Sequence, residues 1–508
     1  MKFSLLEYER PDYEALKNRL GALKKRMEAP ASYEELRDAW LAVKKEIEYA
    51  EYLEEIAHIR HLCGIDYEAS TREVELQNAE EPAIDALRDA CTRLALASPY
   101  ASRLEEEFGK QVFARITEGP VGGESESLKL QAGEARLKTE YRRLMKSKDR
   151  DDGLLFDVFL RLIRTRRELA AARGFGSYID LGYRLRDRYD YGREELSGFR
   201  EQIRKTVVPT LRELKKRGIG PEQFPAKPRG SGELVAAIRT MFADLSGETG
   251  DYIEEMARDE MFDLEGRENK RPDLWTCCML PYRRLPFIVG DYHGGGMETA
   301  AAVHEFGHGF AFRTAAQTQP LYEYHRSSPA VNEIHSKTME HFMYPYLELF
   351  VGGRRRDFVR NHLLQQLENL AYRCAVDEFE HSVYELPGLT RTQVCELWAD
   401  ISRKYRPWIE IGAEKIRSGK NWPRQTHIVE TPFYYIEYDI AQISAWEFRL
   451  RMETDPHGAW EDYLKLCRAG GSRPFGELLA AARLSDPFGE GTVERICGSA
   501  AEALCAVL

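Results

Sequence analysis

Hydrophobic residues recur at helical spacing along most of this 508-residue chain. Leu16, Leu20 and Leu23 follow one another at i, i+4 and i+7, which places them on one face of a helix. Ser32 lies three residues before Glu35, a spacing typical of a capping box where a further helix begins. The periodicity continues to about residue 115 and returns over 127–217, 331–350, 356–386, 391–417 and 434–451. The pattern therefore predicts a mainly α protein.

Glycine and proline interrupt this pattern at 118–123 and at 218–232, and we expect the second stretch to be a surface loop. Short apolar runs at 275–280 and 285–289 flank a proline-containing turn and predict one small β-sheet. A glycine triplet follows at 294–296. We divide the chain into an N-terminal helical domain over 1–190 and a second domain over 191–508, which contains the predicted sheet.

Composition narrows the class of protein. Hydrophobic residues make up 43% and charged residues 31%, which is typical of a globular protein with a charged surface. The net charge of −11 argues against a nucleic-acid backbone or an anionic membrane as the main partner. There is no apolar stretch of signal-peptide or membrane-spanning length, and the nine cysteines are scattered without a C-x-x-C pair. We expect a cytoplasmic protein with reduced, mostly buried thiols.

The strongest chemical pattern is His304-Glu305-Phe306-Gly307-His308. On a helix, His304 and His308 lie on one face and can direct two imidazoles at one ion. Glu305 projects about 100° away and can lie beside the ion without binding it. This arrangement suits a zinc ion with an adjacent general base. The H-E-x-x-H pattern alone is only suggestive, because two ordinary helical histidines produce it as well.

The remaining ligand decides the class of zinc site. The metzincin extension requires Gly and His at positions that are Ala311 and Thr314 here, so that class is excluded. A His₂Glu set needs a carboxylate on a later helix. Glu333 and Glu340 are seven residues apart and share a helix face, so either could reach the ion while the other holds a ligand imidazole. The competing candidates are His335 and His341.

Several motifs together resemble the oligoendopeptidase F and thimet oligopeptidase family of zinc metallopeptidases. The first is H-E-x-x-H followed, 25 residues after His308, by Glu333 in Glu333-Ile334-His335-Ser336. The others, in chain order, are Pro286-Phe287-Ile288, 422–428, 432–438, Ala441-Gln442 and 485–492. The resemblance is strong over about 275–450 and weaker outside that range. Separate motifs in the same order are far more specific than H-E-x-x-H alone.

The resemblance implies a prolate helical fold with a deep substrate channel between two halves, and makes 191–508 the catalytic domain. It implies one zinc ion per chain, bound by His304, His308 and Glu333, with Glu305 as the general base that takes a proton from the attacking water. Donors to the developing oxyanion would be His427, Tyr435 and Tyr438. The tyrosines lie eight and eleven residues after His427, one residue closer than in many relatives, which makes Tyr434 a rival to Tyr435.

The expected substrates are short unfolded peptides, because a narrow channel excludes folded proteins. We expect the peptide to pair with an edge strand at Phe287, Ile288 and Val289 and to approach closely at Gly294, with Tyr434 also in contact. His293 is expected to have a loop role. The predicted activity is endopeptidase cleavage, by a monomer or homodimer.

Two alternatives remain open. A zinc carboxypeptidase or dipeptidase would need a cation for the free substrate carboxylate, for which the candidates are Arg283, Arg284 and Arg424. A catalytically inactive helical peptide-binding protein is the second alternative. The presence of Glu305 beside the predicted ligands argues against it, because binding alone needs no general base.

Overall fold

The computed structural model describes residues 2–117, 124–147, 151–270, 274–411 and 419–508. Within them the chain is mainly helical, with one small sheet, as predicted. The expected break at 118–123 lies outside the described residues. The helix expected over 391–417 ends at Tyr405, because Pro407 cannot continue it and a short 3-10 helix follows over Pro407–Ile411.

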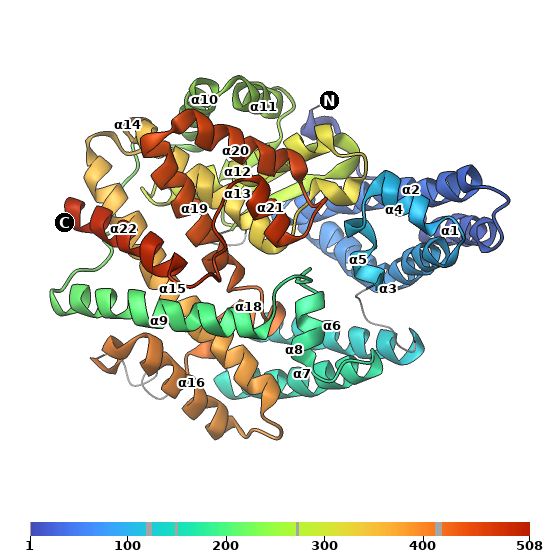
Figure 1. The fold of residues 1–508 in the computed structure, drawn as a ribbon, viewed down its shortest axis with the longest axis horizontal. Coiled ribbons are helices and arrows are strands. Elements are labelled where there is room, and N and C mark those ends of the chain that lie inside the picture. The colour runs from blue at the N-terminus through green and yellow to red at the C-terminus, as the bar shows by residue number, and fades with distance from the viewer. Residues whose placement is uncertain (1, 118–123, 148–150, 271–273, 412–418) are drawn as a thin grey trace.

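The N-terminal helices pack around a core of their own, on the right of Figure 1. Ser32 caps its helix by accepting a hydrogen bond from the Glu35 N–H, whereas the Glu35 carboxylate accepts from the Ala31 N–H, so only half of the predicted capping box forms. The α2 helix also sends Ile56 and Ile59 into the larger core of the molecule, so the two cores share one helix. These helices are α1 (Tyr13–Glu28), α2 (Tyr33–Leu62), α3 (Tyr67–Ala97), α4 (Ala101–Phe108) and α5 (Gln111–Thr117). The division at residue 190 stays a prediction.

The larger core fills the rest of the molecule, in two halves that Figure 1 shows one above the other. The lower half contains α6 (Glu124–Lys146), α7 (Asp152–Ala172), α8 (Tyr178–Arg184), α9 (Arg193–Lys216), α15 (Arg355–Glu385), α16 (Arg391–Tyr405) and α18 (Thr426–Glu430). The upper half contains α10 (Ser231–Leu245), α11 (Gly247–Arg258), α12 (Glu298–Thr318), α13 (Pro329–Phe342), α14 (Leu347–Val351), α19 (Glu437–Thr454), α20 (Pro456–Ala469) and α21 (Phe475–Ala481). The last helix, α22 (Thr492–Val507), packs against α9 and α15.

The sheet has three strands in the order β1-β3-β2. They are β1 (Phe262–Glu265), β2 (Trp275–Leu280) and β3 (Leu285–Tyr292). The β3 strand pairs with β1 in parallel and with β2 in antiparallel fashion. The prediction that Phe287, Ile288 and Val289 form an edge strand is therefore wrong. The sequence did not reveal β1, because this strand has only four residues and two of them are charged.

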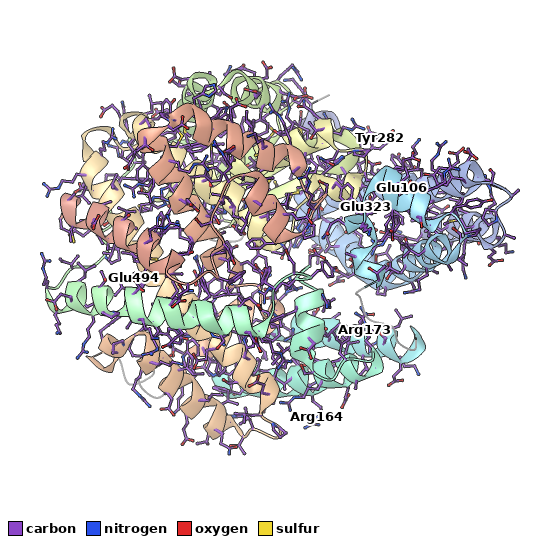
Figure 2. All side chains as sticks on the ribbon, in the orientation of Figure 1. Glu106, Arg164, Arg173, Tyr282, Glu323 and Glu494 are labelled. Carbon is purple, nitrogen blue, oxygen red and sulfur yellow. The ribbon has the colours of Figure 1, made fainter. Side chains whose placement is uncertain are left out.

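As the central strand, β3 is paired on both edges, and its side chains are buried. All eight of its residues are buried, and the Phe287 ring packs on Phe3 with centroids 4.2 Å apart. A substrate strand could pair only at β1 or β2, the two edges. Beyond the end of β2, Tyr282 lies next to α2 (Figure 2), where its ring contacts Tyr49 and Tyr52.

Two further expectations concern the cysteines and membranes. Seven of the nine cysteines are buried, and none forms a disulfide. Among the described residues, none of the helices is long and apolar enough to span a membrane.

Candidate metal centre

The α12 helix begins directly after the glycine triplet, and the triplet is shaped by packing. The Glu298 carboxylate accepts hydrogen bonds from the backbone N–H groups of His293 and Gly295, at 2.7 and 3.1 Å, and so caps the turn. A Cβ at Gly296 would lie 2.1 Å from the Phe224 ring, so only glycine fits there. The loop over 218–230 therefore packs against the start of α12. Gly294 has a positive φ of 88° and open space where a Cβ would be.

A second glycine brings α12 and α13 close together. A Cβ on Gly307 would lie 2.8 Å from the Met339 Cβ and 3.0 Å from the Ser336 Cα. This close approach lets the Glu333 side chain, on α13, reach the histidines of α12. The glycine inside H-E-F-G-H thus sets the distance between the two helices that carry the predicted ligands.

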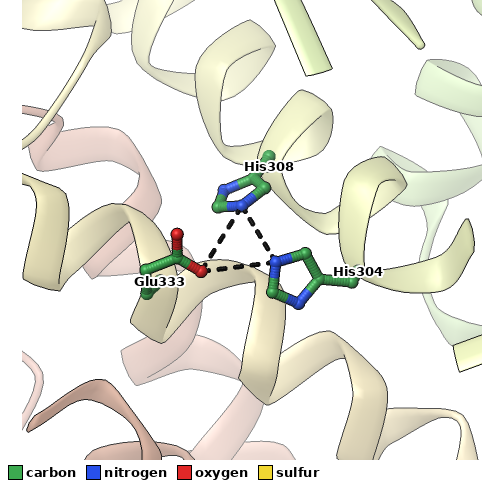
Figure 3. A group of neighbouring side chains, drawn as sticks. All are labelled: His304, His308 and Glu333. Atoms are coloured by element: carbon green, nitrogen blue, oxygen red, sulfur yellow. Dashed lines mark hydrogen bonds and ion pairs between the residues drawn. The ribbon is translucent and has the colours of Figure 1, made fainter. Parts of the chain in front are cut away.

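Three predicted ligands meet between these helices, as Figure 3 shows. His304 Nε2 lies 3.2 Å from His308 Nε2, and Glu333 Oε2 lies 3.3 Å from the first nitrogen and 3.7 Å from the second. In a tetrahedral site with zinc–ligand distances of about 2.0–2.1 Å, neighbouring ligand atoms lie about 3.3–3.5 Å apart. Both the spacing and the His₂Glu donor set therefore fit a zinc ion.

The hydrogen-bond partner of His304 Nδ1 also favours ion binding at Nε2. Its Nδ1 lies 2.6 Å from Glu340 Oε1, so this nitrogen donates its hydrogen and Nε2 is left to bind an ion. The other Glu340 oxygen lies 2.6 Å from His362 Nε2. Glu333 faces the ligand nitrogens, whereas Glu340 orients the His304 ring. Sequence reasoning did not single out His362, because it lies on α15 and no local spacing connects it to the motif.

The charges of the surrounding side chains favour a cation between His304, His308 and Glu333. Burial opposes a charged His304, but hydrogen bonds to Glu333 and Glu340 outweigh burial and raise its pKa to about 10. Burial also opposes ionisation of Glu333, yet His308 and His304 lower its pKa to about 2. Burial lowers the pKa of His308 to about 4, so this ring is neutral, as a metal ligand must be. The centre therefore holds a negative carboxylate that attracts a cation.

Glu305 lies on the same helix but outside the group of three donors. It is 8% exposed, and burial raises its pKa to about 7, opposed by His304. The Cys277 backbone N–H, on β2, donates a hydrogen bond to its carboxylate. Glu305 thus lies between the metal centre and the edge strand of the sheet, with a proton affinity suited to proton exchange near neutral pH.

The segment before α19 brings a tyrosine hydroxyl to the centre. Tyr434 donates a hydrogen bond to Glu333 Oε1, at 2.9 Å, and is also hydrogen-bonded to Tyr438. Tyr435 instead stacks on His427, with centroids 4.3 Å apart, and its ring lies against the Arg373 guanidinium. The structure therefore places the hydroxyl of Tyr434, the rival residue, at the predicted ligands.

His427 has a defined tautomer. The Tyr372 hydroxyl donates to the Gln425 side-chain oxygen, at 3.0 Å, which fixes the orientation of that amide. The Gln425 amide nitrogen then donates to His427 Nδ1, at 2.8 Å. The ring hydrogen of His427 is therefore on Nε2, where it can be donated to an oxygen.

The competing ligands lie elsewhere. The His335 ring packs edge-on against Tyr463, and His341 contacts the amides of Gln366 and Gln442. Neither belongs to the group of converging donor atoms. The exposed His293 ring lies 3.1 Å from Asp291, consistent with a loop role.

Comparison with known proteins identifies relatives over the whole chain. Two family models match, the peptidase M3 N-terminal domain over residues 3–118 and peptidase family M3 over residues 250–496. An X-ray structure of a protein assigned as oligoendopeptidase F has 28% sequence identity and a TM-score of 0.93, covering 100% of this chain and 99% of that chain. PZ peptidase A with an inhibitor has 29% identity and a TM-score of 0.92, covering 99% of each chain. A protein of Bacillus anthracis, also assigned as oligoendopeptidase F, has 25% identity and a TM-score of 0.87, covering 100% of this chain and 98% of that chain. No match was found among curated protein sequences.

Proposed function

Because this chain belongs to peptidase family M3, and is therefore a peptide hydrolase, we propose that it is a zinc-dependent endopeptidase acting on short unfolded peptides. One observation carries the proposal: His304, His308 and Glu333 direct three donor atoms at one point, with the separations of a tetrahedral zinc site. His304, His308 and Glu333 would hold one ion per chain. When bound, zinc would supply Lewis-acid chemistry, polarising the attacking water and the scissile carbonyl.

Glu305 is the proposed general base. Its carboxylate would take the proton of the attacking water and pass it to the leaving amine. Its pKa, raised to about 7 mainly by burial, lets it both accept and release that proton near neutral pH. The hydrogen bond from the Cys277 backbone fixes the carboxylate on the side of the sheet.

The oxyanion that develops on the scissile carbonyl needs donors that are already in place. Tyr434 is the tyrosine we assign first, because its hydroxyl already reaches a predicted ligand carboxylate. Tyr438 is hydrogen-bonded to it, and His427 presents a hydrogen on Nε2. Tyr435 would support this group by stacking on His427.

The substrate strand is proposed to pair with β2. This strand is an edge of the sheet, and Cys277, near its middle, contacts the general base. A peptide paired with β2 would place a carbonyl in front of Glu305, whereas β3 has no free edge. Gly294 remains a candidate substrate contact, since the space beside it is open.

Metal analysis and one substitution test the proposal. We expect about one zinc ion per chain and peptide turnover that chelators abolish. Glu305→Gln should lower kcat about 1000-fold or more while zinc remains bound, because the amide cannot accept the proton. Unchanged turnover in Glu305→Gln would exclude the mechanism, and cleavage that survives complete zinc removal would exclude the metal.

Peptides blocked at both ends separate an endopeptidase from the alternative exopeptidase. An endopeptidase cleaves them, whereas a carboxypeptidase or dipeptidase needs a free terminus. Of the arginines considered for such a terminus, Arg283 is engaged with Asp259, at 3.2 Å. Failure to cleave any blocked peptide, with rapid cleavage of the free forms, would favour the exopeptidase. Binding without turnover in the zinc-loaded protein would favour the inactive peptide-binding protein.

A further inference from the structure

Phe433, the residue before Tyr434, has an unusual backbone conformation. Its φ is +65°, in the left-handed region that a bulky side chain rarely adopts. Such a conformation costs of the order of 1–3 kcal/mol and persists only where the surroundings impose it. The helix that carries Tyr438 begins only at Glu437, so Phe433 directs the Tyr434 side chain independently of that helix.

Buried side chains of an arginine and a glutamate hold both backbone groups of Phe433. Its N–H donates to Glu380 Oε2, at 2.9 Å, and its carbonyl accepts a hydrogen bond from Arg188 Nη2. Arg188 Nε also donates to Glu437, at 2.6 Å, and the Tyr191 hydroxyl donates to the other oxygen of that carboxylate. The side chains of Arg188 and Glu437 are completely buried. One guanidinium therefore ties Phe433 to the first residue of α19.

The ring of Phe433 is enclosed as well. It lies 5.1 Å from the His381 ring and 5.8 Å from the Tyr183 ring, both edge-on, and 5.6 Å from the Tyr384 ring. A Cβ on Gly182 would lie 2.5 Å from it. These neighbours come from α8 and α15 in the lower half, whereas Tyr434 reaches Glu333 in the upper half. Residues 433 and 434 thus span the two halves at the metal centre.

We propose that Arg188 is a positioning residue that holds the Tyr434 hydroxyl at Glu333 by fixing the carbonyl of Phe433. The inference rests on the proposed function, in which Tyr434 donates to the oxyanion. Arg188 touches none of the three predicted metal ligands, so its inferred effect on the rate passes through the Phe433 carbonyl to Tyr434. The planar guanidinium suits this task because its Nε and Nη2 groups reach a carboxylate and a carbonyl at a fixed angle.

A double-mutant cycle tests this inference on the full-length, zinc-loaded enzyme. Arg188→Lys keeps the positive charge beside Glu437 but loses the fixed geometry of two donors. We expect a fall in kcat of about 10–100-fold with little change in KM, as for a misplaced catalytic group. Tyr434→Phe should lower kcat by about 100-fold or more, as for a lost oxyanion donor. In the Tyr434→Phe background, Arg188→Lys should change kcat less than about twofold, because no hydroxyl remains to be positioned.

Arg451→Lys is the matched control. Arg451 also contacts a buried carboxylate, Asp462, and the backbone carbonyls of Ala482 and Arg483, but at the far end of α19. It should destabilise the protein less, because Arg451 is partly exposed and Asp462 keeps Lys465 and Arg483 as partners, and it should leave kcat unchanged. Equal losses of kcat from Arg188→Lys in both backgrounds would overturn the inference while leaving the proposed function intact. No loss from Tyr434→Phe would overturn the assigned oxyanion donor and the inference together.

A second variant covers the case in which Arg188→Lys does not fold. Phe433→Gly adopts a positive φ without strain and keeps both backbone groups, but removes the enclosed ring. The inference expects kcat to stay close to the wild-type value, because Arg188 still holds the carbonyl of residue 433. A folded Phe433→Gly enzyme whose kcat falls as far as that of Tyr434→Phe would overturn the inference, because the ring rather than the guanidinium would then position Tyr434.

Discussion

Two buried clusters of ionisable side chains meet at residues 433 and 434. They differ in the groups that lie beside their carboxylates. In the metal centre, the ligating atoms of His304, His308 and Glu333 face one another, and two imidazoles rather than a guanidinium lie beside the Glu333 carboxylate. In the second cluster, which we call the paired cluster, two carboxylates each lie beside a guanidinium: Glu437 beside Arg188, and Asp377 beside Arg200.

This difference indicates that the metal centre is a binding site, whereas the paired cluster has a structural role. Facing acceptors repel one another unless a cation joins them, so the metal centre is complete only with a ligand from outside the chain. The paired cluster is complete without one, and its cost is the desolvation of its charges. An unbalanced cluster therefore indicates binding, and a balanced cluster indicates positioning.

The largest expected effect comes from removing the carboxylate of the metal centre. Glu333→Ala should lose zinc almost entirely, because two neutral imidazoles remain. Glu340→Ala should weaken zinc binding only about 10–100-fold, because it removes the partner that orients His304 rather than a ligand. Competition titration with a chromophoric chelator measures both affinities. The reverse order would make Glu340 the ligand and Glu333 the residue that orients His304.

That distinction is beyond what the sequence could provide. H-E-x-x-H fixes two ligands, because the spacing of four residues defines one helix face. Glu333 and Glu340 also share one face of α13, so sequence spacing fits both. Only the placement of α13 on α12, set by contact at Gly307, decides which carboxylate faces Nε2 and which faces Nδ1 of His304.

The tyrosines show a second limit. Helical periodicity was extended back to residue 434, whereas the helix begins at Glu437 and Phe433 has a positive φ. A bulky residue in that conformation leaves no local sequence pattern, since its neighbours in three dimensions impose it. The assignment of Tyr435 over Tyr434 came from the family resemblance, with a spacing after His427 that is one residue shorter than in many relatives. The central position of β3 was hidden for a similar reason, because β1 supplies its second neighbour.

An effect of intermediate size is expected at another ion pair, in which Arg166 Nε lies 2.8 Å from Glu134 Oε1. Burial opposes ionisation of Glu134, but Arg166 and Lys138 outweigh it and lower the Glu134 pKa to about 2. A carboxyl with a lowered folded-state pKa stabilises the protein above its unfolded pKa, and this contribution is lost as pH falls towards the folded pKa.

Glu134→Gln tests that dependence. The variant should be less stable than wild type at pH 6, and the difference in unfolding free energy should narrow by about 1 kcal/mol by pH 3.5. Urea unfolding at several pH values measures it, with the variant as the control for all other titrating carboxylates. A difference that stays constant with pH would show that the pair is held by packing rather than by charge.

The last expected effect concerns the helix contact on which the metal centre depends. Gly307→Ala places a Cβ against Met339 and the backbone at Ser336, at 2.8 and 3.0 Å, so α12 and α13 must separate. We expect destabilisation of about 1–3 kcal/mol and weaker zinc binding, because Glu333 moves away from the histidines. Gly198→Ala on α9 is the matched control: nothing lies within 4 Å of its Cβ, so the change should stabilise the protein by up to about 1 kcal/mol. Thermal unfolding with and without chelator measures both variants. If Gly307→Ala left stability and zinc binding as Gly198→Ala does, the close approach of α12 and α13 would not be required for the metal centre.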